Sequence, residues 1–298
     1  MAMTFHVIIG AGATAARTAL LLAAEGERVR IVSRSGGGPD HPLVEKAAAD
    51  AADADRLTGL LEGAATLFNC AAPPYHRWTQ EFPALAAGLL TAAVRTGVPY
   101  VMLGNLYGYG LVEGPVRPGL PLRATGPKGR LRARIWEEAA ASGARVTEVR
   151  AAQFYGAGAV SPFSLMVQPR VLAGALALVA QEPDLPHSYS SIGDTARTLV
   201  AASRDERAWG RAWHVPVVTP SLRELAARLA RLAGAPAPRI EELTERDLAL
   251  LALTDPLWAE FTEVLETPGL PFVSDFTETE EILGVTAAPV DEVLAELL

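Results

Sequence analysis

Residues 6–33 decide the fold of this chain: they read HVIIGAGATA at His6–Ala15 and RVRIVS at Arg28–Ser33. An apolar strand runs into a glycine-rich turn, a helix of small residues follows, and Gly26 ends that helix before a second strand. A nucleotide-binding βαβ unit requires this order of strand, glycine turn, helix and strand. The stretch therefore predicts a parallel α/β sheet with a dinucleotide site at its first turn.

Small residues in this turn suit a bound pyrophosphate. Gly10 permits the tight turn, and Gly12 lets the backbone approach the phosphates. Ala13 opens a helix whose first N–H groups and positive dipole end attract an anion. Ala15 is small enough to keep that helix close to the sheet. We therefore expect Gly10, Gly12, Ala13 and Ala15 to hold the cofactor.

The end of the second strand predicts which dinucleotide binds. NAD-binding proteins usually place an Asp or Glu there, which accepts hydrogen bonds from the ribose. This chain has Ser33, Arg34 and Ser35 instead. A guanidinium with two neighbouring hydroxyls suits a 2′-phosphate, and no carboxylate repels it. The sequence therefore favours NADP(H), the alternative being that Arg34 only points into solvent.

Composition narrows the class of protein further. The chain has 298 residues, is 50% hydrophobic and carries a net charge of −8, which argues against a nucleic-acid partner. Its single cysteine excludes an internal disulfide framework, and its five histidines lack metal-ligand spacing. The start of the chain lacks a basic signal-peptide region, and the longest apolar run is far short of a membrane span. We expect a cytoplasmic enzyme that acts on a small molecule, binds no metal and contacts no membrane. A homodimer is compatible with the sequence.

Strands and helices alternate through the first half of the chain, which predicts a doubly wound sheet of seven mostly parallel strands, the first at residues 6–9. We expect residues 1–160 to form an NADP-binding Rossmann domain. Residues 161–298, helical with short strands at 163–180 and 221–298, should form a smaller substrate lobe, with segments near 187–217 returning to the sheet. Ligands bind beyond the carboxyl ends of parallel strands. The loops expected there are 10–15, 33–35, 71–78, 104–110 and 151–158.

Four further motifs resemble the extended, epimerase/dehydratase-like branch of the short-chain dehydrogenase/reductase superfamily. Ala71-Ala72-Pro73 is similar to the small-residue turn of that branch beside the cofactor, and Tyr109-Gly110 to the Tyr-Gly after its fifth strand. The run 149–156, VRAAQFYG, resembles its VRPxxxYG, and the run 187–196 resembles a segment of its second lobe. The resemblance implies that Ala71 and Ala72 contact the cofactor. It also implies an acidic turn near the adenine, which Asp50 matches.

The resemblance also exposes a departure from the branch, whose enzymes usually use Tyr-x-x-x-Lys together with a Ser or Thr. Lys128 falls at the position of the lysine, which holds the nicotinamide ribose. Ala124 stands at the position of the tyrosine, and Asn105 at that of the Ser or Thr. The chain has only two lysines, so a lysine here is expected to be needed for its compact ammonium. The alternative is a solvated basic run shared with nearby arginines.

A proton must then come from another group. Asn105 can donate a hydrogen bond to a carbonyl oxygen but cannot deliver a proton at neutral pH. Tyr107, two residues further on, is the favoured acid, and Tyr155 and His76 are other candidates. We expect His76, Gln153 and Tyr155 to face the substrate.

The function predicted from these residues is an NADP(H)-dependent reductase of a small carbonyl- or imine-type metabolite. One alternative is an epimerase or dehydratase of a sugar nucleotide, although the missing tyrosine counts against it. An alternative of another class is a protein that senses NADP(H) and acts through a protein partner without catalysis.

Overall fold

Seven strands form one parallel sheet in the computed structural model, which describes residues 4–254, 258 and 269–298. The strand order is β10-β6-β5-β4-β1-β2-β3, and every neighbouring pair is parallel. The strands are β1 (Phe5–Ile9), β2 (Arg28–Ser33), β3 (Val44–Ala48), β4 (Ala64–Asn69), β5 (Tyr100–Asn105), β6 (Val146–Ala151) and β10 (Ala212–His214). The predicted seven-strand Rossmann-like sheet is therefore confirmed.

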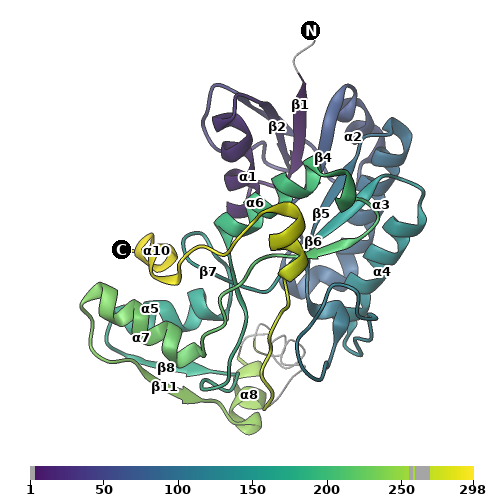
Figure 1. Ribbon diagram of the computed structural model, residues 1–298. Coiled ribbons are helices and arrows are strands. Elements are labelled where there is room, and N and C mark those ends of the chain that lie inside the picture. The colour runs from purple at the N-terminus through teal and green to yellow at the C-terminus, as the bar shows by residue number, and fades with distance from the viewer. Residues whose placement is uncertain (1–3, 255–257, 259–268) are drawn as a thin grey trace.

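Helices cover both faces of this sheet (Figure 1). One face carries α1 (Ala13–Ala24) and α6 (Ile192–Arg204), and the other carries α2 (Ala54–Leu61), α3 (Trp78–Thr96) and α4 (Pro127–Ala141). Small residues of α1, such as Ala15 and Ala19, are fully buried, which lets this helix lie close to β1. Leu57 and Leu89 fill the opposite face. Burial on both sides explains why β1 and β4, at the centre of the sheet, are mostly apolar.

Helix α3 contains Pro83, which lies five residues after the start of the helix. Proline lacks an N–H donor and is tolerated best in the first turn of a helix, so local preference alone would favour a start at Pro83. In the structure Trp78 begins the helix, and its indole N–H donates to the carbonyl of Pro73 at 3.0 Å. Packing of Trp78 against Phe82, with ring centroids 5.3 Å apart, accompanies the earlier start.

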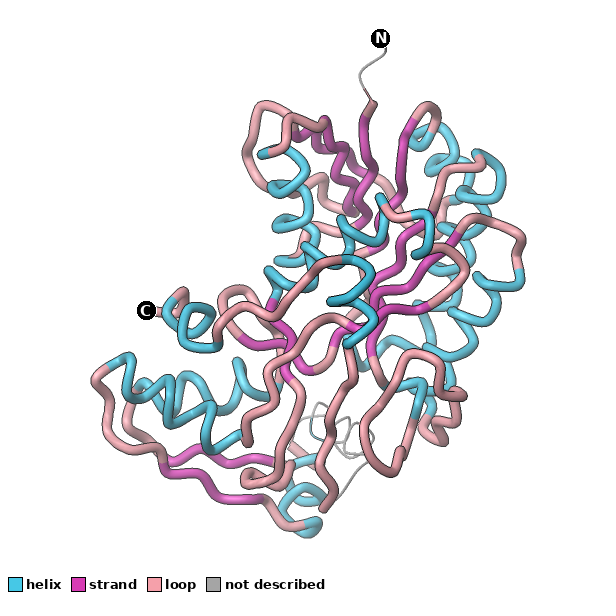
Figure 2. The backbone as a smooth tube through the Cα atoms, viewed as in Figure 1, coloured by secondary structure: helices cyan, strands magenta, loops and turns pink. Residues whose placement is uncertain are grey.

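The second part of the chain forms a smaller lobe beside the carboxyl ends of the strands (Figure 2). Its strands form two short parallel pairs, and its helices enclose a separate apolar core. The elements are β7 (Gln153–Tyr155) with β9 (Tyr189–Ser191), β8 (Leu176–Val179) with β11 (Arg239–Glu242), α5 (Gln168–Leu172), α7 (Leu222–Ala233), α8 (Glu245–Ala252) and α10 (Val290–Ala295). Between these elements the chain returns to the large sheet, where α6 covers one face and β10 pairs with β6.

Residues 163–180 contain helical turns followed by a short strand, which agrees with the expected mixture of helix and short strands. A π-helical turn, η3 (Phe163–Val167), and α5 end at Leu172, and residues 176–179 form β8. Ala177 and Val179 are buried while Leu178 is exposed, which is the alternation of a strand. The apolar run suited either structure, and pairing with β11 decides for the strand.

Candidate functional site

The glycine turn after β1 forms a cradle that fits a dinucleotide pyrophosphate. Gly10 has a φ of +110°, and a Cβ there would lie 3.1 Å from the backbone of Cys70 and Ala71. Gly12 is the N-cap of α1, makes no side-chain capping bond, and has no atom within 4 Å of an added Cβ. The first turn of α1 contains no acidic residue. The first N–H groups of α1, which have no partner within the helix, therefore lie beside open space.

A second loop closes against this turn from the other side. A Cβ on Gly158, which follows β7, would lie 2.7 Å from the Cβ of Ala13. Gly158 has a φ of +75°, so the close approach and the backbone conformation both require glycine. The structure thus brings the loop after β7 beside the glycine turn after β1.

Arg34 and Ser35 are exposed at the carboxyl end of β2, and Ser33 is half-buried. The Ser33 hydroxyl donates to the carbonyl of Gly37 at 3.2 Å, which holds the loop after β2. The first carboxylate after this strand is Asp40, which is ion-paired with Lys46. The hydrogen bond and ion pair from Lys46 of β3 lower the pKa of Asp40, so this carboxylate already has a partner within the chain. Arg34 therefore stands at the expected position for a 2′-phosphate with no carboxylate at residues 33–39.

The other expected cofactor residues lie in turns at the same edge of the sheet. Asp50 is exposed and accepts a hydrogen bond from Ala52 N–H at 2.9 Å. Ala71 follows β4, and its N–H donates to the Asn69 side chain at 3.0 Å. Ala72 beside it is exposed. These contacts fix the turns, and the cofactor roles of Asp50, Ala71 and Ala72 remain predictions.

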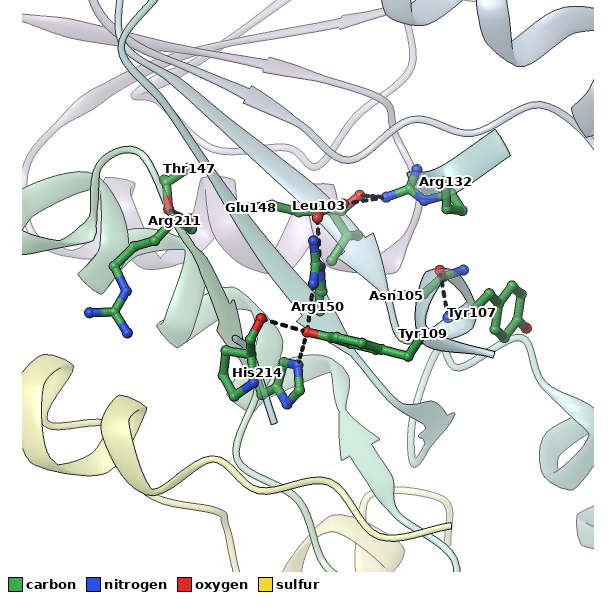
Figure 3. A network of polar contacts seen from close by, with 11 residues as sticks. Leu103, Asn105, Tyr107, Tyr109, Arg132, Thr147, Glu148, Arg150, Arg211 and His214 are labelled. Carbon is green, nitrogen blue, oxygen red and sulfur yellow. Dashed lines mark hydrogen bonds and ion pairs between the residues drawn. The ribbon is translucent and has the colours of Figure 1, made fainter. Parts of the chain in front are cut away.

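A cavity of about 260 Å³ lies where the carboxyl ends of β5 and β6 meet the smaller lobe. Asn105 at the end of β5 and Tyr107 in the next turn, η2 (Tyr107–Tyr109), line it together with Gln153 of β7. The Asn105 side-chain oxygen accepts from Tyr107 N–H at 3.3 Å (Figure 3). That bond leaves the Asn105 amide N–H₂ able to donate. Three of the predicted site residues are thus brought together.

Lys128 lies beside this cavity and not on a solvated surface. It is 6% exposed in the first turn of α4, and its Nζ lies 4.8 Å from the centroid of the Tyr75 ring. Tyr75 lines the cavity, and its ring lies edge-on to that of Tyr107, with centroids 6.5 Å apart. Arg132, one turn further along α4, is also buried. A solvated basic run over residues 128–134 is therefore wrong for Lys128 and Arg132, whereas Arg130 and Arg134 are exposed.

Backbone atoms pack closely against Ala124, which stands at the position of the missing tyrosine. Ala124 N–H donates to the carbonyl of Gly108 at 3.1 Å. A Cβ on Gly110, whose φ is +66°, would lie 2.8 Å from the Cα of Ala124. The loop 104–126 is thus folded back tightly on itself beside Ala124.

The two remaining acid candidates do not line the cavity. His76 is exposed in η1 (Tyr75–Arg77). Tyr155 is fully buried in the smaller lobe, with its ring 6.2 Å from that of Tyr189. Burial raises the pKa of Tyr155 above its ordinary value of 10, which makes its phenol a poorer acid at neutral pH. The expected substrate contacts of His76 and Tyr155 therefore find no support in the geometry.

A buried charge network lies beneath the cavity, and no local pattern in the sequence predicts it. Glu148 of β6 is held between two buried arginines: Arg132 Nη2 lies 3.2 Å from Oε1, and Arg150 Nε lies 2.7 Å from Oε2 (Figure 3). A Cβ on Gly104 would lie 2.3 Å from the same carboxylate. Glycine at that position of β5 therefore makes room for the ion pair.

The network continues to the turn that carries Tyr107. Arg150 Nη1 donates to the Tyr109 hydroxyl at 2.5 Å, and that hydroxyl lies 2.7 Å from His214 Nε2. His214 Nδ1 lies 3.0 Å from the carbonyl of Asp275, so the bond pattern assigns the proton to Nδ1 and makes Nε2 the acceptor. Burial lowers the pKa of His214 to about 3 and raises that of Tyr109 to about 12. Both groups are neutral at pH 7 and anchor η2 against β6 and β10.

Comparisons with known proteins show that this fold is similar to that of several solved structures. The Thermotoga maritima UDP-glucose 4-epimerase with UDP-glucose is 15% identical, with 98% of this chain and 97% of that chain covered and a TM-score of 0.77. The Streptomyces venezuelae dTDP-glucose 4,6-dehydratase with NAD is 17% identical over 98% and 95% of the two chains, also at 0.77. The Bordetella bronchiseptica enzyme WbmH with NAD⁺ is 19% identical over 99% and 97%, at 0.78.

The chain has the fold of the extended short-chain dehydrogenases/reductases. The resemblance inferred from the sequence motifs is confirmed at this level. No protein-family model matches the sequence, and no curated protein does. Two of the solved structures described above are sugar-nucleotide enzymes, and the two that hold a nicotinamide cofactor hold NAD.

The described residues also bear on metals and membranes. No group of three or more His, Cys, Asp or Glu side chains that could hold a metal ion occurs among them. Within the same part of the chain, no helix has both the length and the apolar character needed to cross a bilayer.

Proposed function

We propose that this chain is a nicotinamide-dinucleotide-dependent oxidoreductase that reduces a small carbonyl- or imine-type metabolite. One observation carries the proposal: the open glycine cradle after β1 and the cavity with Asn105 and neighbouring Lys128 lie at the same carboxyl edge of the sheet. A dinucleotide whose pyrophosphate rests on Gly12 extends along this edge, as ligands of doubly wound sheets do.

The preferred cofactor in this proposal is NADP(H). Arg34 is exposed at the carboxyl end of β2, where the adenosine ribose of a bound dinucleotide would lie in this proposal, and the nearest following carboxylate, Asp40, is ion-paired with Lys46. A guanidinium can form charge-assisted hydrogen bonds to a 2′-phosphate, whereas NAD offers only a hydroxyl at that point. The NAD-bound solved structures make NAD the competing choice.

A bound reduced nicotinamide would supply the hydride. The side chains of this protein would hold the cofactor, donate hydrogen bonds to the substrate and supply the proton. The Lys128 ammonium is placed to donate to ribose hydroxyls and to hold the ring at the cavity. The Asn105 amide N–H₂ donates to the substrate oxygen or nitrogen, which stabilises the charge that develops there. The Tyr107 hydroxyl passes a proton to that atom. An iminium substrate would need no proton. Aromatic walls exclude water from the reacting atoms.

The second candidate is an epimerase or dehydratase of a sugar nucleotide. The comparisons favour it, because several of the solved structures are sugar-nucleotide epimerases or dehydratases, such as those that bind UDP-glucose or UDP-glucuronic acid. Oxidising a sugar hydroxyl requires a base beside it. Ala124 cannot be that base, so Tyr107 alone would have to serve, and none of the described residues that line the cavity is a lysine or arginine that could hold a diphosphate. For this reason we place the second candidate below the reductase.

Two measurements separate the candidates. NADPH and NADH are titrated by the change in their fluorescence, and NADPH oxidation is followed with a panel of aldehydes, ketones and cyclic imines. In parallel, UDP-glucose and dTDP-glucose are incubated with the protein and NAD⁺, and their products are analysed by NMR. NADPH oxidation with any panel member supports the reductase. An epimerised or dehydrated sugar nucleotide supports the second candidate, and tight NADPH binding without turnover in either assay favours a sensing role.

A further inference from the structure

The cavity at the end of β5 and β6 carries no formal charge in its lining. None of the described residues that line it is a lysine, arginine, aspartate or glutamate. Its one histidine, His187, is neutral at pH 7 because burial lowers its pKa to about 4. A charged ligand placed there would lose its hydration without meeting a counter-charge, which is costly. The lining itself therefore discriminates by charge.

Three arginines of the described residues are ion-paired outside the cavity lining. Arg150 and Arg132 face Glu148 beneath the cavity, and in the smaller lobe Arg223 is ion-paired with Asp184. Residues 255–268, most of which lie outside the described part, contain neither lysine nor arginine. Lys128 contacts the outer side of the site through the Tyr75 ring and, in the proposed function, holds the cofactor ribose.

Flat aromatic surfaces make up much of the wall. Trp78 and Tyr75 stand on one side, with ring centroids 4.9 Å apart. His187 and Phe272 belong to the other lobe and are stacked, with centroids 5.4 Å apart at an interplanar angle of 30°. The two pairs suit a flat ring, because aromatic side chains bury large areas at low entropic cost and pack against ring faces.

Polar contacts to a ligand come from neutral amides. The side-chain oxygen of Gln153 is buried and has no hydrogen-bond partner among the described residues. A buried orphan amide costs free energy unless a ligand or water completes it. Gln181, also in the lining, lies 3.4 Å from the Tyr189 hydroxyl through its Nε2. With Asn105, these amides can donate to and accept from a carbonyl, imine or amide group.

We propose that this cavity binds an uncharged ring compound bearing a hydrogen-bonding carbonyl or imine group, and that it excludes nucleoside diphosphates. At about 260 Å³ it lies at the small end of ligand sites, which span roughly 300–1,000 Å³. That size suits a compact substrate beside the cofactor ring. The inference rests on the proposed function for the reaction, but binding in the cavity is independent of turnover.

Calorimetry with a matched pair of probes tests the proposal. Benzamide and benzoate have the same ring and nearly the same shape but differ in charge; UDP-glucose is the third ligand. Each is titrated into the full chain with and without NADP⁺. Benzamide should bind at least about tenfold more tightly than benzoate, and UDP-glucose should bind more weakly than either. Equal affinities for the two ring probes, no binding of benzamide, or preferential binding of UDP-glucose would overturn the proposal.

Variants of Gln153 connect the result to this cavity. Gln153→Leu should weaken benzamide binding by about tenfold, the order expected for one hydrogen bond, and Gln153→Glu should weaken it further by adding a charge. Gln80→Glu makes the same charge change at an exposed position of α3 and serves as the control. Circular dichroism checks that each variant is folded. If both Gln153 variants bind benzamide as the unmodified chain does, the site lies elsewhere. A chain that never oxidises NADPH but shows this charge selectivity refutes the proposed reaction alone.

Discussion

Replacing Gly12 with alanine should weaken dinucleotide binding while leaving the fold intact. Gly12 has φ −74° and ψ 178°, a conformation that alanine adopts without strain, and an added Cβ would meet no atom within 4 Å. The space beside Gly12 is where the proposed function puts the pyrophosphate. The substitution therefore tests whether that space is used by a ligand.

Two opposing effects on folding make the stability change at Gly12 small. Alanine restricts the unfolded chain, which stabilises the protein by about 0.4–1 kcal/mol. Alanine is also the poorer N-cap, by about 0.5–1 kcal/mol. The net change in the free energy of unfolding should stay within about 1 kcal/mol. NADPH binding should weaken at least about tenfold, or about 1.4 kcal/mol, because the Cβ occupies the approach of the phosphates.

Gly10→Ala is the matched control, because this substitution should lower the stability of the fold as well as cofactor binding. Gly10 has a φ of +110°, and a Cβ there would lie 3.1 Å from backbone atoms of Cys70 and Ala71. Backbone strain of this kind costs about 1–3 kcal/mol, and the close contacts add to it. The melting temperature should therefore fall by several degrees, together with binding.

Fluorescence titration with NADPH and thermal unfolding followed by circular dichroism measure the two effects separately. Gly12→Ala should lose affinity at nearly constant melting temperature, whereas Gly10→Ala should lose both. Unchanged NADPH affinity in Gly12→Ala would refute the assignment of the pyrophosphate to this turn. A fully stable Gly10→Ala would refute the argument from its backbone geometry.

Arg34→Ala should weaken NADPH binding by an order of magnitude or more and leave NADH almost unchanged, because charge-assisted hydrogen bonds contribute roughly 1.5–3 kcal/mol each; equal losses in calorimetry would contradict the NADP(H) preference. Lys128→Ala should lower kcat sharply in a folded protein, and Lys128→Arg should restore little, because a guanidinium fork does not reproduce the ammonium geometry. Tyr107→Phe should lower turnover at least about a hundredfold with cofactor binding intact, as general acids contribute 10²–10⁴-fold; near-normal turnover would indicate an iminium-type substrate that needs no acid, and a cation of this kind would contradict the uncharged ligand inferred for the cavity. As the pH falls from 6.5 toward 4, the free energy of unfolding should fall by up to about 1.4 kcal/mol per pH unit for each of His187 and His214. The unfolded state takes up these protons near the ordinary pKa of 6.5, whereas the folded pKa values are about 4 and about 3; urea titrations across this range that show constant stability would contradict the burial argument.

The cofactor half of the site could be predicted from the sequence because its parts are contiguous. One run of residues, 6–33, carries the first strand, the turn, the helix and the second strand, and local sterics dictate the glycine at Gly10. The edge strand β3 escaped prediction, because its residues VEKAA lack an apolar run and are mostly exposed. It forms through pairing with β2, which is a tertiary contact.

The substrate half of the site was decided by tertiary structure. Asn105 and Gln153 were candidates from their positions after strands, but the partners that give the cavity its neutral, aromatic character, His187 and Phe272, come from distant parts of the chain. No local pattern connects such residues, and part of the surroundings that keep His187 uncharged comes from a residue distant in the sequence, Phe272.

The buried network beneath the cavity shows the same division. In the sequence, Arg132 belongs to a basic run that suggests a solvated face, and Glu148 interrupts an apolar strand without explanation. The fold places both on one side of β5, where Gly104 leaves room for the carboxylate and Arg150 completes the ion pairs. Sequence determined the strands, turns and cradle, because these follow from neighbouring residues and backbone sterics. Only the packing of distant segments decided which charges are buried and which can contact a ligand, because desolvation depends on everything that surrounds a group.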